Sequence, residues 1–312
     1  MSASVDPPVA GAAQEDDLED AGRAGWFVRI TIVVIVVLWI IPTLGVLITS
    51  FRPEALVNSS GWWTALAHPF QAAGWTLENY ELALVDGGFG NAFLNSLAVT
   101  IPSTVIPITI AAFAAYAFAW MDFKGRYVMF VIVVALLVVP LQMALIPILR
   151  LYTQGITLFG MQIIPDLDLQ GTFLGVWLAH AGFGLPLAVY LLRNYIGSLP
   201  SSIIESAKID GADHFTIFWR LVVPLSVPAL AAFAIFQFLW VWNDLLVAYV
   251  FLGGAGKNRV LTVALREMVG ARGENWHLLT SAAFISMALP LVVFFSLQKY
   301  FVRGLTAGSV KG

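Results

Sequence analysis

Residues 30–48 read ITIVVIVVLWIIPTLGVLI, an apolar run without a charged side chain. A helix of this length crosses the hydrocarbon core of a bilayer, which is roughly 30 Å thick. Arg23 and Arg29 precede the run, as basic residues do in a signal peptide. The run is too long for the apolar region of a signal peptide, however, and no small-residue cleavage site follows it. The sequence therefore predicts a first membrane span that is retained.

Five further apolar runs follow the first one. They cover residues 91–120, 127–149, 173–192, 225–252 and 278–302. Hydrophobic residues make up 59% of the 312-residue chain and charged residues 11%, whereas soluble domains contain roughly 45–50% and 25%. These numbers exclude a water-soluble fold. They predict an all-α polytopic membrane protein with six transmembrane helices.

The charged residues predict how the chain is oriented. With the amino terminus inside, the inner segments hold most of the 16 lysines and arginines, so we expect both termini to be cytoplasmic. Acidic residues between Glu15 and Asp20 account for much of the net charge of -3. We therefore expect residues 1–25 to form a disordered acidic leader, and we expect no nucleic-acid partner. The chain has no cysteine, which removes disulfides and thiolate chemistry.

Signatures of catalysis are missing from the sequence. The nearest string to a phosphate-binding loop, residues 254–258, has neither the spacing nor the hydroxyl that would hold magnesium. The four histidines lie singly, without metal-ligand spacing. No serine lies in a nucleophile elbow. We therefore predict no catalytic residue, no metal site and no cofactor on this chain.

The inner loop at residues 198–224 is rich in residues that begin and end helices. Ser202 and Glu205 have the spacing of a capping box, which predicts a helix start. Gly211 is placed to end that helix in the left-handed conformation. Asp213 is placed to cap a second helix, on which Phe215 belongs to an apolar face that no membrane span requires. The loop is thus predicted to be two short helices joined by a tight turn.

This loop resembles the EAA loop of the permeases of ATP-binding-cassette (ABC) importers. Its residues are Glu205-Ser206-Ala207, then Gly211 after three residues, then Leu221-Val222-Val223-Pro224 after nine. It departs from the family pattern at Ser206, Leu221 and Val223. The resemblance implies that residues 26–312 form a permease domain whose loop docks on an ATPase subunit through Glu205, Ala207, Asp210 and Gly211, with Phe215 as an exposed aromatic plug. The alternative is an amphipathic helix lying on lipid.

The carboxyl end carries a second resemblance. Residues 304–312 read GLTAGSVKG and are similar to the tail of the smaller permease subunit of maltose-type transporters. The resemblance implies that Thr306, Ala307, Gly308 and Lys311 contact the ATPase chains. The alternative is a frayed glycine-rich terminus.

Polar residues in the predicted fifth span are the candidates for the substrate pathway. They are Gln237, Trp240, Asn243, Asp244 and Tyr249. A buried aspartate costs roughly 2.5 to 3.5 kcal/mol in a membrane helix unless it faces a cavity or a partner. Aromatic faces with amide and carboxylate groups suit a saccharide. Polar residues also join helices to one another within membranes, and that alternative remains open.

The resemblance implies a permease subunit in a bacterial plasma membrane that imports an oligosaccharide or alpha-glucoside. The implied partners are a second permease, two ATPase subunits that hold ATP and magnesium, an extracytoplasmic sugar-binding protein and membrane lipid. Two other classes are weighed against it. An ion-coupled secondary transporter predicts internal repeats and several buried ionisable residues, and a membrane scaffold predicts a signalling domain in an inner segment.

Overall fold

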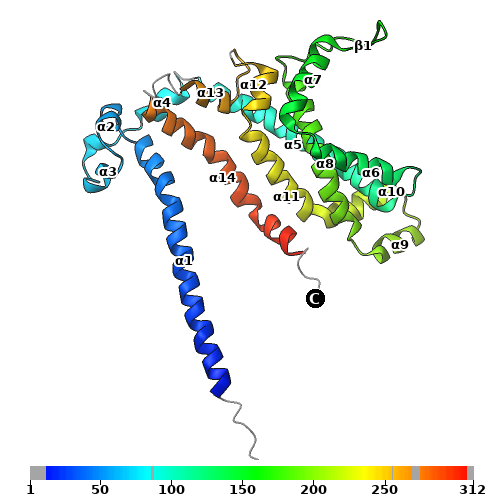
Figure 1. Cartoon of the computed structure of the whole chain (residues 1–312), viewed down its shortest axis with the longest axis horizontal. Coiled ribbons are helices and arrows are strands. Elements are labelled where there is room, and N and C mark those ends of the chain that lie inside the picture. Colours follow the sequence, from blue (N-terminus) through cyan, green and yellow to red (C-terminus); the bar gives the residue numbers. More distant parts are fainter. Residues whose placement is uncertain (1–11, 86–87, 255, 269–274, 308–312) are drawn as a thin grey trace, which may run out of the picture.

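The computed structural model describes the backbone of residues 12–85, 88–254, 256–268 and 275–307, and their side chains between residues 25 and 298 except at Ala72. Within these residues, five helices are long and apolar enough to cross a membrane, and one bent pair of helices brings the number to six when the pair is counted as one span (Figure 1). The five are α1 (Ala12–Ser50), α5 (Phe89–Trp120), α8 (Phe173–Gly197), α11 (Val223–Trp242) and α14 (Trp276–Ala307). The prediction of an all-α polytopic fold is confirmed.

The third crossing is bent rather than straight. Helix α6 (Arg126–Ala135) continues through the 3-10 turn η2 (Leu136–Val138), and α7 (Leu141–Gln154) then leaves at 106°. Val139 between them is extended, with φ −72° and ψ 116°, because the ring of Pro140 disfavours a helical conformation in the preceding residue. The apolar run predicted at residues 127–149 is therefore divided into two helices at this proline. A short hairpin of β1 (Ile156–Leu158) and β2 (Met161–Ile164) follows α7.

The fifth crossing also differs from its predicted bounds. Helix α11 ends at Trp242, and a separate short helix, α12 (Leu246–Leu252), follows. The carboxylate of Asp244 accepts hydrogen bonds from the amides of Val247 at 3.3 Å and Ala248 at 3.0 Å. Asp244 therefore satisfies the exposed amides of a new helix start, which interrupts the predicted span 225–252.

The leader is helical where the structure describes it. Helix α1 begins at Ala12, so residues 12–25 extend the first span instead of forming the predicted disordered segment, and residues 1–11 lie outside the described residues. The physical reason is cooperativity: once the apolar span forms a helix, each added residue gains a hydrogen bond without a new nucleation cost. Alanine, the best helix former, is the most frequent residue in this stretch, and glutamate, glutamine and leucine add to its helix propensity.

Short helices cover the end of the molecule where the first and last spans meet. They are α2 (Glu54–Ser59), α3 (Trp63–Ala67), the 3-10 turn η1 (Ala72–Gly74), α4 (Glu78–Leu84) and α13 (Leu261–Met268). Arg52 is buried there and donates to the carbonyls of Leu56 and Ser60, both at 3.0 Å. The carbonyl of Leu56 also accepts from the amide of Ser60 at 3.0 Å, so Arg52 adds a second bond there and supplies a donor to the carbonyl of Ser60 just beyond the helix.

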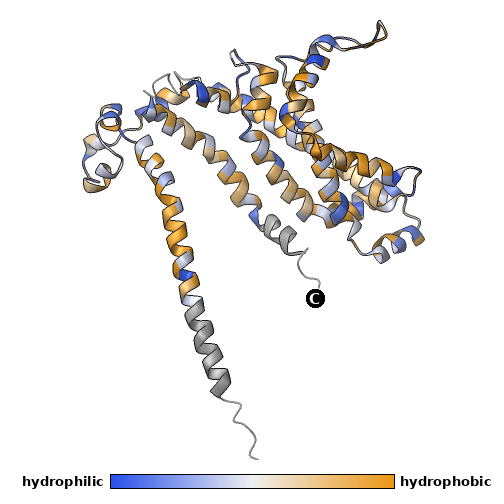
Figure 2. Cartoon of the chain, in the orientation of Figure 1, coloured by the Kyte–Doolittle hydropathy of each residue, from blue (hydrophilic) through white to orange (hydrophobic). Residues whose placement is uncertain are grey.

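Helices α5 and α8 pack against each other and form the centre of the fold. Small buried residues at their contact, such as Ala111, Ala115 and Ala188, let the two backbones approach closely. Helix α1 instead stands apart, with nearly all of its apolar side chains exposed (Figures 1 and 2). Exposed apolar side chains of this kind suit contact with lipid.

A glycine sets the contact between α8 and α11. We predict that Gly184→Ala destabilises the protein by about 1–3 kcal/mol, because a Cβ at this position would lie 2.7 Å from the side-chain oxygen and nitrogen of Gln237. Gly182→Ala is the matched control on the same helix, because nothing lies within 4 Å of its added Cβ. Thermal unfolding in detergent measures the difference. Equal midpoints for the two variants would contradict this packing, and adding Gln237→Ala to Gly184→Ala should relieve the clash.

Candidate functional site

The loop at residues 198–224 folds as two short helices around a glycine turn. Helix α9 (Ser201–Ile209) is followed by its C-cap Asp210 and then by Gly211, which has the left-handed φ of +80°. The amide of Ala212 donates to the carbonyl of Ala207 at 2.9 Å, and the amide of Gly211 donates to that of Lys208 at 3.1 Å. These two bonds define a Schellman motif. The spacing of Ala207 and Gly211 in the loop sequence is therefore the spacing that this helix ending requires.

The second short helix, α10 (His214–Ile217), begins as predicted. The carboxylate of Asp213 accepts a hydrogen bond from the amide of Thr216 at 2.8 Å. Hydrogen bonding with Thr216 also lowers the pKa of Asp213 below its ordinary value, since these bonds favour the charged form. Gly211 and Asp213 together give the loop a defined path between its two helices.

The predicted capping box at the start of α9 was wrong. The residue before the helix is Pro200, and no side chain caps it. Helix α9 starts two residues earlier than the Ser202–Glu205 spacing indicated, so Ser202 is already inside the first turn. The fixed φ of proline, here −57°, makes Pro200 compatible with a helix entry without a side-chain cap.

Helix α10 continues into the membrane without a break. A π-helical segment, η3 (Phe218–Val222), joins it to α11, and the amide of Val223 donates to the carbonyl of Phe218. Pro224 follows at once and has no amide hydrogen, so the ladder widens by one residue at this point. The second helix of the loop and the fifth span are thus one continuous element, His214–Trp242, although the sequence predicted two.

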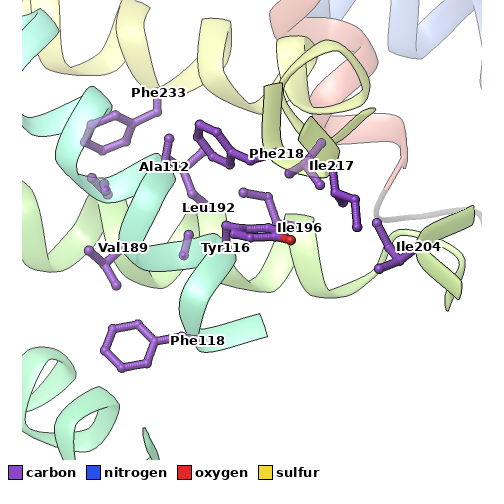
Figure 3. Close-up of a cluster of buried hydrophobic side chains, with 14 residues drawn as sticks. Ala112, Tyr116, Phe118, Val189, Leu192, Ile196, Ile204, Ile217, Phe218 and Phe233 are labelled. Atoms are coloured by element: carbon purple, nitrogen blue, oxygen red, sulfur yellow. The ribbon is translucent and has the colours of Figure 1, made fainter. Parts of the chain in front are cut away.

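The loop is anchored to the two central helices by apolar side chains. Ile204 on α9 and Ile217 on α10 are each about 1% exposed. Figure 3 shows them packed into one cluster with Tyr116 of α5 and Ile196 of α8. The Tyr116 hydroxyl also lies 2.8 Å from Nδ1 of His214. The loop therefore cannot move far without moving the helices beneath it.

The opposite side of the loop is open. The side chains of Ile209 and Phe215 are 86% and 67% exposed. Glu205, Asp210 and Gly211 are also exposed, and Ala207 is half-buried. Four of the five predicted coupling residues therefore lie on the accessible surface of the loop, and Ala207 lies at its turn. The apolar residues of α10 divide between the cluster and this open side.

The candidate pathway residues on α11 and α12 do not form one group. Gln237 is fully buried and donates from Nε2 to the carbonyl of Ser103 on α5 at 3.2 Å. Asn243 donates to the carbonyl of Leu239 in its own helix. The ring of Tyr249 lies 4.8 Å from the guanidinium carbon of Arg266. The contact of Gln237 is of the kind that joins helices in a membrane, which was the alternative interpretation of these residues.

Trp240 and Asp244 instead converge on a residue that sequence reasoning missed. His180 of α8 is fully buried, its ring lies edge-on to the ring of Trp240 with centroids 5.8 Å apart, and its Nε2 lies 3.7 Å from Oδ2 of Asp244. Neither ring nitrogen of His180 has a hydrogen-bond partner within the described residues. The available signal was a single ionisable residue inside an apolar span, which by default indicates function.

An apolar cavity adjoins this group. It has a volume of about 320 Å³ and lies at the bend of the third crossing. Val139 and Leu141 line it on one side and Phe183, Pro186 and Trp240 on the other. Trp240 therefore lines this cavity and also contacts the ring of His180.

The tail residues are less fully described. Thr306 and Ala307 end helix α14, but the structure describes only their backbone, and Gly308 and Lys311 lie outside the described residues. Among the residues that the structure does describe, no group of three or more His, Asp or Glu side chains has an arrangement suited to a metal ion.

Comparisons with known proteins agree with the fold. A family profile described as "Binding-protein-dependent transport system inner membrane component" matches residues 108–307. The osmoprotective compounds uptake permease protein GgtD of Synechocystis is 57% identical over 91% of each chain. The alpha-glucoside transport system permease protein AglG of Rhizobium meliloti is 43% identical over 92% of this chain and 97% of its own.

Solved structures share the architecture at low identity. A chain of a bacterial alginate ABC transporter, in complex with an alginate pentasaccharide-bound periplasmic protein, has a TM-score of 0.65. The match covers 89% of this chain and 94% of that chain, at 13% identity. At this identity the likeness shows the fold alone.

The cap at Asp213 can be tested beside Ser202, which is not a cap in the structure. We predict that Asp213→Ala speeds hydrogen exchange at the start of α10 about fivefold, because one amide loses its acceptor. Ser202→Ala is the control and should leave exchange in α9 unchanged, because Ser202 is not a cap. Exchange mass spectrometry measures both.

Since its folded pKa is lowered, Asp213 caps the helix at neutral pH and loses this effect as the pH falls through that pKa. Faster exchange in α9 of the Ser202→Ala variant would show instead that Ser202 does cap this helix.

Proposed function

Because this chain belongs to the family of binding-protein-dependent transport system inner membrane components, we propose that it forms part of the pathway through which an ABC importer carries an oligosaccharide or alpha-glucoside. It is a multi-pass membrane protein and a transport component of that family. The observation that carries the coupling part of the proposal is the loop of α9 and α10, which is rigid within, anchored to α5 and α8, and open on one side.

The loop has the properties that transmission of force requires. The connection between its two helices is defined by the Schellman turn at Gly211 and the cap at Asp213. Its inner side is held by Ile204 and Ile217. We propose that Glu205, Ala207, Asp210, Gly211 and Phe215 form the contact with a separate ATPase subunit, which holds ATP and magnesium. Closure of the ATPase pair would then displace α5, α8 and α11 together.

The remaining partners follow from the same assignment. A second permease pairs with this chain, because one such subunit lines only part of a pathway, and two ATPase subunits bind beneath the pair. An extracytoplasmic binding protein delivers the solute. Six crossings place both termini on one side, and we propose that this side is the cytoplasm, where Thr306, Ala307, Gly308 and Lys311 reach the ATPase chains.

The substrate class is supported by the relatives' names and by the residues near the bend. The relative from Rhizobium meliloti carries an alpha-glucoside name. Here the face of Trp240 provides a platform for the apolar face of a sugar ring, and Asp244 accepts hydrogen bonds from hydroxyl groups. Gln237, Asn243 and Tyr249 lie on the same crossing and its outer extension. An ion-coupled transporter or a scaffold has no use for an exposed, rigid loop of this kind.

The coupling proposal predicts the effect of one exposed side chain. Phe215→Ser should lower recovery of the ATPase subunits with the permease, and binding-protein-stimulated ATP hydrolysis, by about tenfold or more, because truncating a central aromatic contact typically costs over 1 kcal/mol. Phe70→Ser is the matched control for ATPase recovery, because Phe70 lies between α3 and η1, away from the loop, and its side chain is 97% exposed. Full recovery and stimulation in Phe215→Ser would show that the loop only lies on lipid.

The pathway proposal separates transport from packing at Trp240. We expect Trp240→Leu in the reconstituted importer to raise the half-saturating concentration of an alpha-glucoside about tenfold, because a stacking platform is lost. The measurement is uptake into vesicles, beside thermal unfolding of the same preparation. A lower unfolding midpoint with an unchanged half-saturating concentration would assign Trp240 to helix packing alone.

A further inference from the structure

The hairpin after α7 is an amphipathic ribbon. Its strands are antiparallel, with Ile156 opposite Ile164, Leu158 opposite Met161, and Thr157 opposite Gln162. Residues directly opposite each other share a face, and alternate residues along a strand share a face. One face is therefore entirely apolar and the other carries Thr157 and Gln162. Ile163 has no cross-strand partner because the register shifts by one residue there.

The turn of the ribbon presents a phenylalanine in an unfavourable conformation. Phe159 and Gly160 have φ +51° and +81°, as the two central residues of a type I′ turn do. A bulky residue rarely adopts positive φ, and asparagine is the residue that favours this position. The Phe159 side chain is also 93% exposed. A strained and fully exposed aromatic ring at a tip has no role in the packing of this chain, and strain of this kind is typical of sites that clamp a ligand or partner.

The segment that carries the ribbon is constrained by close contacts at both of its ends. Gly155 has φ +65°, and a Cβ there would collide with the carbonyl oxygen of Ile164. The returning chain is tied to the next loop, because the amide of Gly171 donates to the carbonyl of Phe251 at 2.7 Å and Asn258 Nδ2 donates to the carbonyl of Gly171 at 3.0 Å. The ribbon therefore projects as a fixed arm (Figure 1).

The arm lies at the opposite end of the molecule from the coupling loop. Helix α8 connects the two, with the arm before its first residue and α9 after its last. A helix of 25 residues is about 37 Å long, the length of one crossing. If the coupling loop is cytoplasmic, the arm is extracytoplasmic, so this step rests on the proposed function.

Two occupants compete for the apolar face, the bilayer surface and a protein. Residues 155–172 contain Asp166 and Asp168, both exposed, and no lysine or arginine. Segments that bind anionic bilayer surfaces are rich in basic residues, and tryptophan and tyrosine mark membrane interfaces. This arm has neither. Its charge and its exposed apolar tip favour a protein partner.

We propose that this arm, residues 156–164, is a docking site for the importer's soluble binding protein. The partner offers an apolar groove for Phe159, Leu158 and Met161, bordered by basic residues that face Asp166 and Asp168. Docking of a rigid, preorganised arm costs little conformational entropy, which suits a partner that binds and leaves in every cycle.

The first experiment measures how the rate of ATP hydrolysis depends on the concentration of binding protein. Phe159→Asn removes the ring but keeps the turn, since Asn-Gly is the favoured type I′ pair. It should raise the half-maximal concentration of binding protein about tenfold or more, with the saturating rate unchanged. Gln162→Ala on the polar face is the control and should change it less than about twofold. An unchanged concentration for Phe159→Asn overturns the proposal.

The second experiment observes the arm directly and does not depend on hydrolysis. The chain has no cysteine, so Phe159→Cys carries a single spin label in nanodiscs. The proposal expects a label accessible to water-soluble relaxers that becomes immobile when binding protein is added, while a label at Gln162→Cys changes less. A label buried in lipid, or one that stays mobile with binding protein, overturns it. An immobilised label without stimulated hydrolysis would contradict the proposed coupling and leave the docking arm intact.

Discussion

A bilayer offers no hydrogen bonds to the backbone, and this constraint determines where the chain is allowed to deviate from a helix. Every break inside the apolar crossings has a local cause that also supplies or removes partners. Pro140 extends Val139 and bends the third crossing. Pro224 lacks an amide hydrogen, and the helical hydrogen bonds just before it, at Phe218–Val222, follow the wider π-helical pattern. Asp244 supplies acceptors where α12 begins. The irregular points are therefore a consequence of proline and aspartate chemistry, and they coincide with the places where the crossings connect to functional segments.

The loop of α9 and α10 and the membrane helices pack as one continuous unit. Helix α10 continues through the π segment into α11, and α9 is held by Ile204 against the same cluster that joins α5 to α8. The Schellman turn between them is closed by backbone bonds, so it does not depend on a partner to stay folded. A displacement at the exposed side of the loop therefore reaches three crossings without passing through a flexible link.

The polar groups near the bend differ in how well they are satisfied. Gln237 uses its amide nitrogen in a contact with α5 and leaves only its Oε1 without a partner, whereas neither ring nitrogen of His180 has a hydrogen-bond partner among the residues that the structure describes. A buried polar atom without a partner is costly. In a subunit that changes conformation, a second arrangement of the helices that gave such an atom a hydrogen-bond partner would be stabilised by that bond. The adjoining cavity gives Trp240 room on one side for that change.

The sequence by itself determined the features that depend on near neighbours along the chain. Apolar runs predicted the crossings, and Gly211 and Asp213 predicted the turn and the second cap, because these bonds join residues within five positions. The tertiary structure alone decided which distant residues meet. It separated Gln237 from Trp240 and Asp244, and it added His180 from another helix. The physical reason is that spacing along the chain sets local hydrogen bonding. Contacts between helices depend instead on how each helix is rotated about its axis and on the angle at which it crosses its neighbours, and an apolar run specifies neither.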